Sequence, residues 1–247
     1  MPYQVSEINP AKCVLIVVDM QNDFVAPGAP METPAGRAML PNLIRAIDCC
    51  RDNGAKVIYT AHAHRKDGCD VGLFAKLWPP VASKAGLVDG TKGIEIYDEV
   101  APRAGEIVVK KHRYSAFYGT DLGIILRNSG IDTVVIAGVT TENCCLSTAR
   151  DALFRDYKVV FLSDATATFD YPDVGQGAMS ADEVHRTVLV ILSVSTAHVM
   201  KVEEFVGRMI SAKEGRRANN KSGKKSTASV HQEPHPKQRR SAKALRA

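Results

Sequence analysis

Residues 133–145, TVVIAGVTTENCC, carry an apolar strand through a glycine and into the start of a helix. The strand portion, 133–137, is short, continuous and rich in β-branched residues, and the helical pattern that follows runs from about residue 142 to 157. Residues 14–18, VLIVV, form a similar run that is apolar on both faces, as a strand covered by helices on both sides must be. Together these stretches predict the strand–helix units of a parallel α/β sheet.

The same alternation of short strands and longer amphipathic segments runs along most of the chain. Strands are predicted at 14–18, 56–60, 107–110, 133–137, 158–162 and 197–201. Helices are predicted at 35–53, 120–128, 142–157, 180–195 (opened by a capping box of Ser180 and Glu183) and in a last segment that ends near residue 210. Residues 62–100 contain Gly, Asp and Pro throughout and are predicted to form a long surface excursion. We expect one doubly wound, three-layer α/β domain over residues 1–211, with a mainly parallel sheet of about six strands.

The net charge of +5 is divided unevenly between this domain and the C-terminal residues. Residues 212–247 hold eleven Lys and Arg against two Glu, a charge of +9, which leaves the first 211 residues at −4. The tail has few apolar and no aromatic residues, so we expect a disordered, solvated extension and not a contact with nucleic acid or membrane. There is no secretory signal, no apolar stretch of about 20 residues, and no disulfide or zinc spacing among the six cysteines, which favours a cytoplasmic protein.

Three chemically useful side chains stand where predicted strands end. Asp19 follows the first strand, Lys111 follows the third, and Cys144 lies in the first turn after the fourth. Ligands of an open parallel sheet bind beyond the carboxyl ends of its strands, so an acid, an amine and a thiol are expected to meet at one edge. The start of a helix also favours a thiolate, as an activated nucleophile requires.

The motifs around these residues resemble those of the isochorismatase-like cysteine hydrolases, over about residues 10–210. They are D-x-Q-N-D-F at 19–24, K-x-x-Y-S-A-F at 111–117 and G-V-x-T-x-x-C at 138–144, and their combination in this order is specific. The resemblance implies that Asp19 is the general base, Lys111 its cationic partner and Cys144 the nucleophile, with no cofactor. It also implies a cis peptide before Thr140, an oxyanion hole made by the backbone N–H groups of Thr140 and Cys144, and a homo-oligomer, dimer or tetramer.

The expected reaction is cysteine-dependent hydrolysis of a C–N bond in a small linear amide or ureido compound, through a thioester. Biuret, ureidoacrylate and N-carbamoyl compounds are the substrate types that the resemblance favours. Three alternatives stay open: a vinyl ether hydrolase of the isochorismatase type, a nicotinamidase, and a non-catalytic oligomeric scaffold. Cys144 counts against the first, because members with that activity typically lack the cysteine. The nicotinamidase metal motif is incomplete around His62 and His64, so no metal is expected.

Further pocket residues are predicted from the same motifs and loops. Candidates for substrate binding are Asn22, Phe24, Tyr114, Phe117 and Gln176, although Phe24 and Phe117 could equally belong to the core. Residues 64–72 resemble the segment that covers the substrate in ureido-specific members, and could equally be a solvated loop. Two close neighbours are assigned no catalytic role: Lys110 must face away from Lys111, and Cys145 is expected to pack against the sheet.

Overall fold

A computed structural model describes residues 3–212 and residue 215 of the chain. The predicted tail, 212–247, thus lies almost entirely outside the described residues. Within them, no helix is both long enough and apolar enough to cross a membrane.

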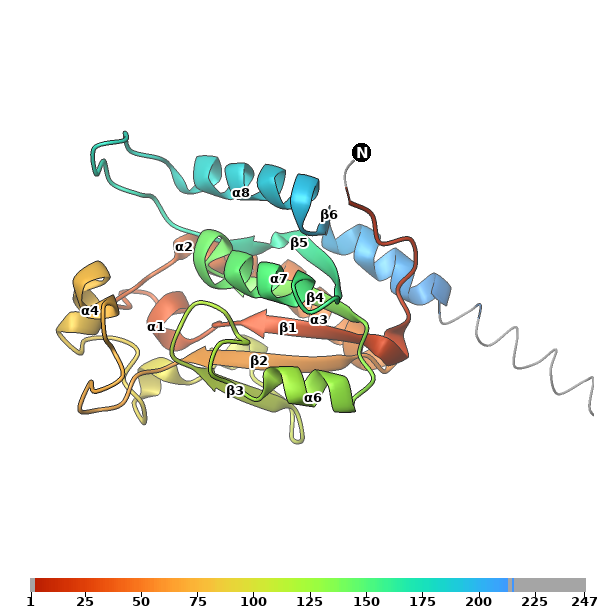
Figure 1. Ribbon diagram of the computed structural model, residues 1–247, viewed down its shortest axis with the longest axis horizontal. Helices are drawn as coiled ribbons and strands as arrows, with labels where there is room; N and C mark the ends of the chain where they lie inside the picture. The colour runs from red at the N-terminus through yellow and green to blue at the C-terminus, as the bar shows by residue number, and fades with distance from the viewer. Residues whose placement is uncertain (1–2, 213–214, 216–247) are drawn as a thin grey trace, which may run out of the picture. The chain divides into compact units, whose positions relative to one another are not determined.

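The predicted parallel sheet is confirmed and has six strands (Figure 1). They are β1 (Cys13–Val18), β2 (Lys56–His62), β3 (Ile107–Lys111), β4 (Thr133–Val139), β5 (Lys158–Ala167) and β6 (His198–Met200). Their order is β3-β2-β1-β4-β5-β6, and all five neighbouring pairs are parallel. The chain therefore adds strands on one side of β1 and then crosses to its other side, so that the switch point of the topology lies between β1 and β4.

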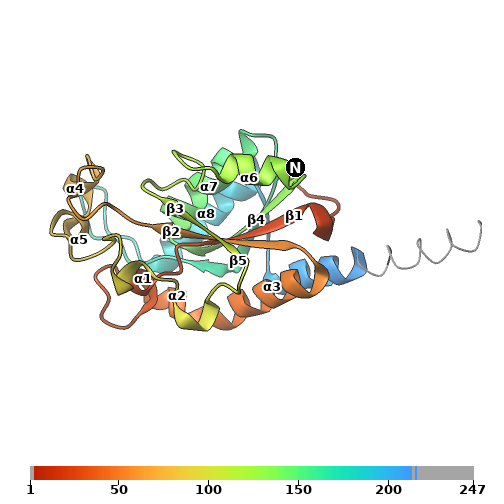
Figure 2. The ribbon, with the colours of Figure 1, turned by 90° about the horizontal axis from the view of Figure 1, so that it is seen from below.

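Helices cover both faces of the sheet, which confirms the three layers (Figure 2). The helix α3 (Leu40–Asn53) and a helix over residues 202–212 lie on one face. On the other face lie α6 (Leu122–Asn128), α7 (Leu146–Leu153) and α8 (Ala181–Ser195). Alternate residues of β1 point into the two cores: Leu15 and Val17 into the first, Val14 and Ile16 into the second. This is why the strand is apolar throughout.

Two predicted helices have different bounds in the structure. The one predicted at about 142–157 is a π-helical turn followed by α7, which ends at Leu153. Residues 35–53 do not form a single helix: α2 (Pro34–Ala38) ends before Met39, and α3 begins at Leu40. Pro41 lies in the first turn of α3, where its missing N–H is tolerated, whereas in the middle of a longer helix it would break a hydrogen bond. The predicted stop at Gly54 (φ 75°) and the predicted capping box of α8 are both confirmed.

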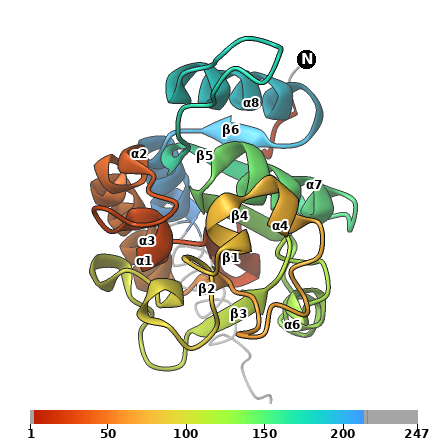
Figure 3. The same ribbon diagram turned by 90° about the vertical axis from the view of Figure 1, so that its left-hand side faces the viewer.

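The excursion over residues 62–100 has more structure than predicted. It carries two short helices, α4 (Phe74–Leu77) and α5 (Pro79–Ala82), and two 3₁₀ turns, Lys92–Ile94 and Asp98–Val100. Asp23, in the short helix α1 (Asn22–Val25), fixes it in place: its Oδ2 accepts from the Leu87 N–H at 2.6 Å. Figure 3 looks at the carboxyl end of the sheet, where α1 and α4 lie in front of the strands. The excursion thus covers the edge at which the three candidate residues stand.

Candidate active site

Asp19 is held in place immediately after β1. It is fully buried and has a left-handed backbone (φ 49°), a conformation that non-glycine residues adopt at a cost. Its Oδ1 accepts from the hydroxyl of Thr60, in β2, at 2.6 Å, and its backbone N–H donates to the Oγ1 of Thr60 at 3.1 Å. These contacts leave the Oδ2 oxygen directed at the remaining members of the site.

Lys111, at the end of β3, reaches Asp19 across the width of one strand. β3 lies two places from β1 in the sheet, a separation of about 10 Å that a lysine side chain can largely span. Its Nζ lies 2.7 Å from Asp19 Oδ2 and donates to Cys144 Sγ at 3.2 Å and to the Arg113 carbonyl at 3.0 Å. Lys110 turns away and pairs with Asp89 on the surface. The ammonium therefore joins the acid and the thiol in one buried cluster.

Cys144 stands in a π-helical turn, Thr141–Cys145, that precedes α7. The peptide between Val139 and Thr140 is cis, as the resemblance implied. The first N–H groups of a helical segment have no carbonyl partner within it, whereas the Cys145 N–H already donates to the Thr140 carbonyl at 3.1 Å. Cys145 is fully buried in the core, as expected.

Burial governs the protonation of this cluster. Burial raises the pKa of the Cys144 thiol far above its ordinary value, and Asp19 adds to the rise, whereas Lys111 opposes it. Burial therefore opposes the thiolate that the helix start was expected to favour, and Lys111 acts on the side of the thiolate. Burial alone would lower the pKa of Lys111, but Asp19 and Cys144 outweigh that effect and raise it.

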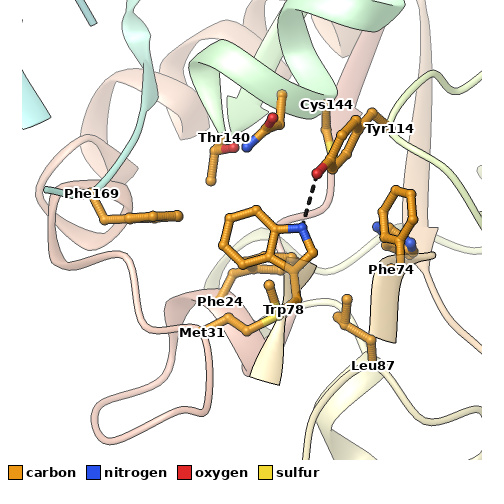
Figure 4. Close-up of a pocket in the computed structure, with 11 residues that line it drawn as sticks. Phe24, Met31, Phe74, Trp78, Leu87, Tyr114, Thr140, Cys144 and Phe169 are labelled. Atoms are coloured by element: carbon orange, nitrogen blue, oxygen red, sulfur yellow. Dashed lines mark hydrogen bonds between the residues drawn. The ribbon is translucent and has the colours of Figure 1, made fainter. Parts of the chain in front are cut away.

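A narrow pocket with a cavity volume of about 20 Å³ opens onto Cys144 (Figure 4). Most of its lining is aromatic or aliphatic, and the full set is Phe24, Met31, His62, Phe74, Trp78, Leu87, Tyr114, Thr140, Asn143, Cys144 and Phe169. Trp78 Nε1 donates to the Tyr114 hydroxyl at 2.9 Å, which fixes both rings beside the thiol. A cavity of this volume has room for about one water molecule.

The structure brings together two of the five predicted substrate-binding residues, Phe24 and Tyr114. Asn22 does not line the pocket, because its side-chain amide donates to the carbonyls of Lys92 and Glu95. Phe117 lies in the second core, with its ring stacked against Tyr157. Gln176 is exposed in the loop before α8.

Several lining residues were missed from sequence. Residues 64–72 do not line the pocket; the excursion contributes instead through His62, Phe74, Trp78 and Leu87. Trp78 had a usable signal, since it is the only tryptophan in the chain and is followed by two prolines. Met31 and Phe169 had none.

Among the described residues, two groups offer three possible metal ligands within 4.8 Å of one another: Asp19–His62–Cys144 and His64–Asp70–His112. In the first, the ammonium of Lys111 already contacts Asp19 and Cys144 and would repel a metal cation. In the second, His112 Nδ1 lies 2.6 Å from the Ala63 carbonyl and so carries a proton there, which removes that nitrogen as a ligand. Neither group fits a metal ion as it stands.

Comparison with known proteins agrees with this geometry. The model of the isochorismatase domain matches residues 13–204. A probable inactive nicotinamidase of Arabidopsis thaliana is 37% identical over 62% of this chain and 79% of its own length. A ureidoacrylate amidohydrolase of Methylorubrum extorquens is 32% identical over 67% of this chain and 74% of its own. The crystal structure of a cysteine hydrolase from Pseudomonas syringae pv. phaseolicola has a TM-score of 0.82 and 35% identity, covering 86% of this chain and 99% of that one.

Proposed function

The chain belongs to the isochorismatase family of hydrolases, and on that premise we propose that it cleaves the C–N bond of a small linear amide or ureido compound, with Cys144 as nucleophile. One observation carries the proposal. The ammonium of Lys111 contacts both Asp19 and Cys144, at 2.7 and 3.2 Å, in a fully buried cluster that opens onto a small pocket. Relatives named as amidohydrolases and amidases support the same reaction class.

The first step is a proton transfer within the cluster. Loss of the thiol proton to solvent is unfavourable, because a lone thiolate would be buried. Transfer to Asp19 is different: the negative charge moves from the carboxylate to the sulfur, and both atoms contact the same ammonium. Net charge in the cluster is unchanged, so the low dielectric does not oppose the step. Lys111 thereby allows a buried thiol to become a nucleophile.

The thiolate then attacks the substrate carbonyl carbon. We assign stabilisation of the resulting oxyanion to the backbone N–H groups of Thr140 and Cys144, each worth about 3 kcal/mol in comparable sites. Asp19 returns its proton to the departing nitrogen, and ammonia or an amine leaves as the C–N bond breaks. A water molecule, deprotonated by the same carboxylate, then cleaves the thioester, and the proton passes back to sulfur.

The proposal is tested by ammonia release over a panel of biuret, ureidoacrylate, N-carbamoyl amino acids, nicotinamide and oxamate, ranked by kcat/KM. Cys144→Ala should abolish release from every active compound, while Cys145→Ala, its buried neighbour, should retain it. Intact-protein mass spectrometry of a quenched reaction should show the acyl group on the parent enzyme and not on Cys144→Ala. Turnover by Cys144→Ala comparable to that of the parent would refute the assignment.

A further inference from the structure

A second pocket adjoins the one that holds Cys144. It has a cavity volume of about 280 Å³, opens to solvent, and is lined by Pro30, Met31, Glu32, Trp78, Pro80 and Phe169. Met31, Trp78 and Phe169 line both pockets, so the two share a wall. Trp78 and Phe169 meet edge to face, with ring centroids 6.0 Å apart. The side chains of Met31, Trp78 and Phe169 therefore lie between Cys144 and the outer pocket and contribute apolar surface to both.

Neither pocket offers a cation to a ligand. Among the described lining residues, Glu32 has the only side chain that is charged at neutral pH, and it is paired with Arg37 at 2.6 Å. His62 is neutral, because burial, followed by the charge of Lys111, holds its pKa well below the ordinary value. Lys111 itself lies behind Cys144, fully buried and paired with Asp19.

Ionised groups of both signs lie behind the lining residues. Arg113 lines neither pocket; its guanidinium lies over the ring of Phe74, and its Nη1 donates to two backbone carbonyls. The Glu142 carboxylate likewise lies behind a lining residue: its Oε1 accepts from Asn143 Nδ2 at 2.9 Å and from the Tyr171 hydroxyl at 2.8 Å. A carboxylate on the substrate would therefore lose its water in this pocket without a cation among the lining residues to pair with it, and with the Glu142 carboxylate nearby.

We infer that the substrate is an uncharged amide whose non-reacting part is apolar and extended, reaching from Cys144 past Trp78 to the outer pocket. The inference rests on the proposed function and narrows it. Ureidoacrylate and N-carbamoyl amino acids each carry a carboxylate and are disfavoured. Neutral amides with an alkyl or arylalkyl group match the apolar residues that line both pockets. Burial of an unpaired carboxylate should weaken binding by about 100-fold or more.

Trp78 gives a direct measure of binding, because it is the only tryptophan in the chain. Its fluorescence is followed in Cys144→Ala protein, which holds ligands without converting them, during titration with two matched pairs. The pairs are hexanamide with the monoamide of adipic acid, and 3-phenylpropanamide with its para-carboxylated analogue. The neutral member of each pair should bind about 100-fold more tightly, and 3-phenylpropanamide more tightly than benzamide. Equal or tighter binding of the carboxylates, or no binding by any neutral amide, overturns the inference.

A charge-reversal variant tests the cause of this preference. Met31→Lys places a cation on the wall that the two pockets share and should shift the preference at least about 10-fold toward the carboxylated member. Val174→Lys adds the same charge at a side chain that is 82% exposed and lines neither pocket, and should leave the preference unchanged. A similar shift in both variants overturns the inference. Cys144-dependent turnover that favours carboxylates overturns it too, but leaves the proposed function standing.

Discussion

Gly138 offers a sharp test of how the sheet positions the active site. It lies in β4 opposite Val18 of β1, with a φ of 113°. A Cβ atom built on it would lie 2.1 Å from the Val18 carbonyl oxygen and 2.6 Å from the Val18 nitrogen. Both are backbone atoms of a central strand, so no side chain can move aside. In Gly138→Ala, β4 must therefore shift relative to β1.

The expected effect can be estimated from these contacts. Separating the Cβ from the Val18 oxygen to the 3.0 Å that real contacts reach requires a movement of about 0.9 Å. The left-handed backbone adds about 1–2 kcal/mol for an alanine, and the overpacked contact about as much again. A total loss of about 3 kcal/mol should lower Tm by roughly 6–12 °C in a domain of this size. Asp19 follows Val18, and Thr140 follows closely on Gly138, so the same movement disturbs the cluster and should reduce kcat about 100-fold.

Alanine substitutions at two other glycines separate the effect of backbone strain from the effect of the close contact with Val18. Gly130→Ala shares the positive φ (64°) but has no atom within 4 Å of the added Cβ, and Gly207→Ala has neither the strain nor the contact. Thermal unfolding and turnover of the best amide should rank Gly207→Ala near the parent, Gly130→Ala slightly lower in Tm alone, and Gly138→Ala lowest in both. If Gly138→Ala matches Gly130→Ala in Tm and kcat, the close approach of β1 and β4 does not hold the site together.

Three further predictions follow from the buried charges and the tail. Lys111→Met leaves the Asp19 carboxylate buried without a cation. It should lower the free energy of unfolding, measured with urea, by about 3–5 kcal/mol and remove nearly all turnover. A stability equal to the parent's would contradict the ion pair. Because the pKa of His62 is depressed in the folded state, the unfolded chain binds more protons below about pH 6.5. Stability should therefore fall by up to about 1.4 kcal/mol per pH unit on acidification, and less steeply in His62→Gln; equal slopes would contradict this origin. Deletion of residues 212–247 should leave kcat/KM within about twofold of the full chain, and a folded but inactive truncation would show that the tail takes part.

The sheet and the cluster were predictable because their signals are local or periodic. Each strand is a short apolar run, and the carboxyl ends of parallel strands must share one edge, which brings Asp19, Lys111 and Cys144 together. The strand period of two residues also separates Lys111 from Lys110. The capping box of α8 needs only the spacing of Ser180 and Glu183. None of these inferences depends on the path of a long loop.

The pocket walls and the state of the thiol were not predictable in the same way. Met31, Trp78 and Phe169 come from three segments far apart in sequence, and no strand or helix period relates them. Phe117, with the same apolar character, packs in the core instead, because its segment turns toward Tyr157. The effect of burial on the thiol was hidden for a similar reason: the helix start is visible in the sequence, whereas the burial of Cys144 depends on contacts from the whole fold.

The catalytic cluster of Asp19, Lys111 and Cys144 is held more rigidly than the apolar wall of Trp78 and Phe169. We therefore expect the cluster to determine reactivity and the wall to determine substrate selectivity. The distances of 2.7 and 3.2 Å around Lys111 join side chains at the ends of β1, β3 and β4, whose spacing the hydrogen bonds of the sheet fix. The apolar wall joins Trp78 to Phe169 through ring contacts between two connecting segments. Phe169→Ala should therefore change KM and the order in which amides are preferred, while Cys144 keeps its reactivity as a nucleophile. The reason is that, among the described residues, Phe169 makes no hydrogen bond or ion pair with Asp19, Lys111 or Cys144.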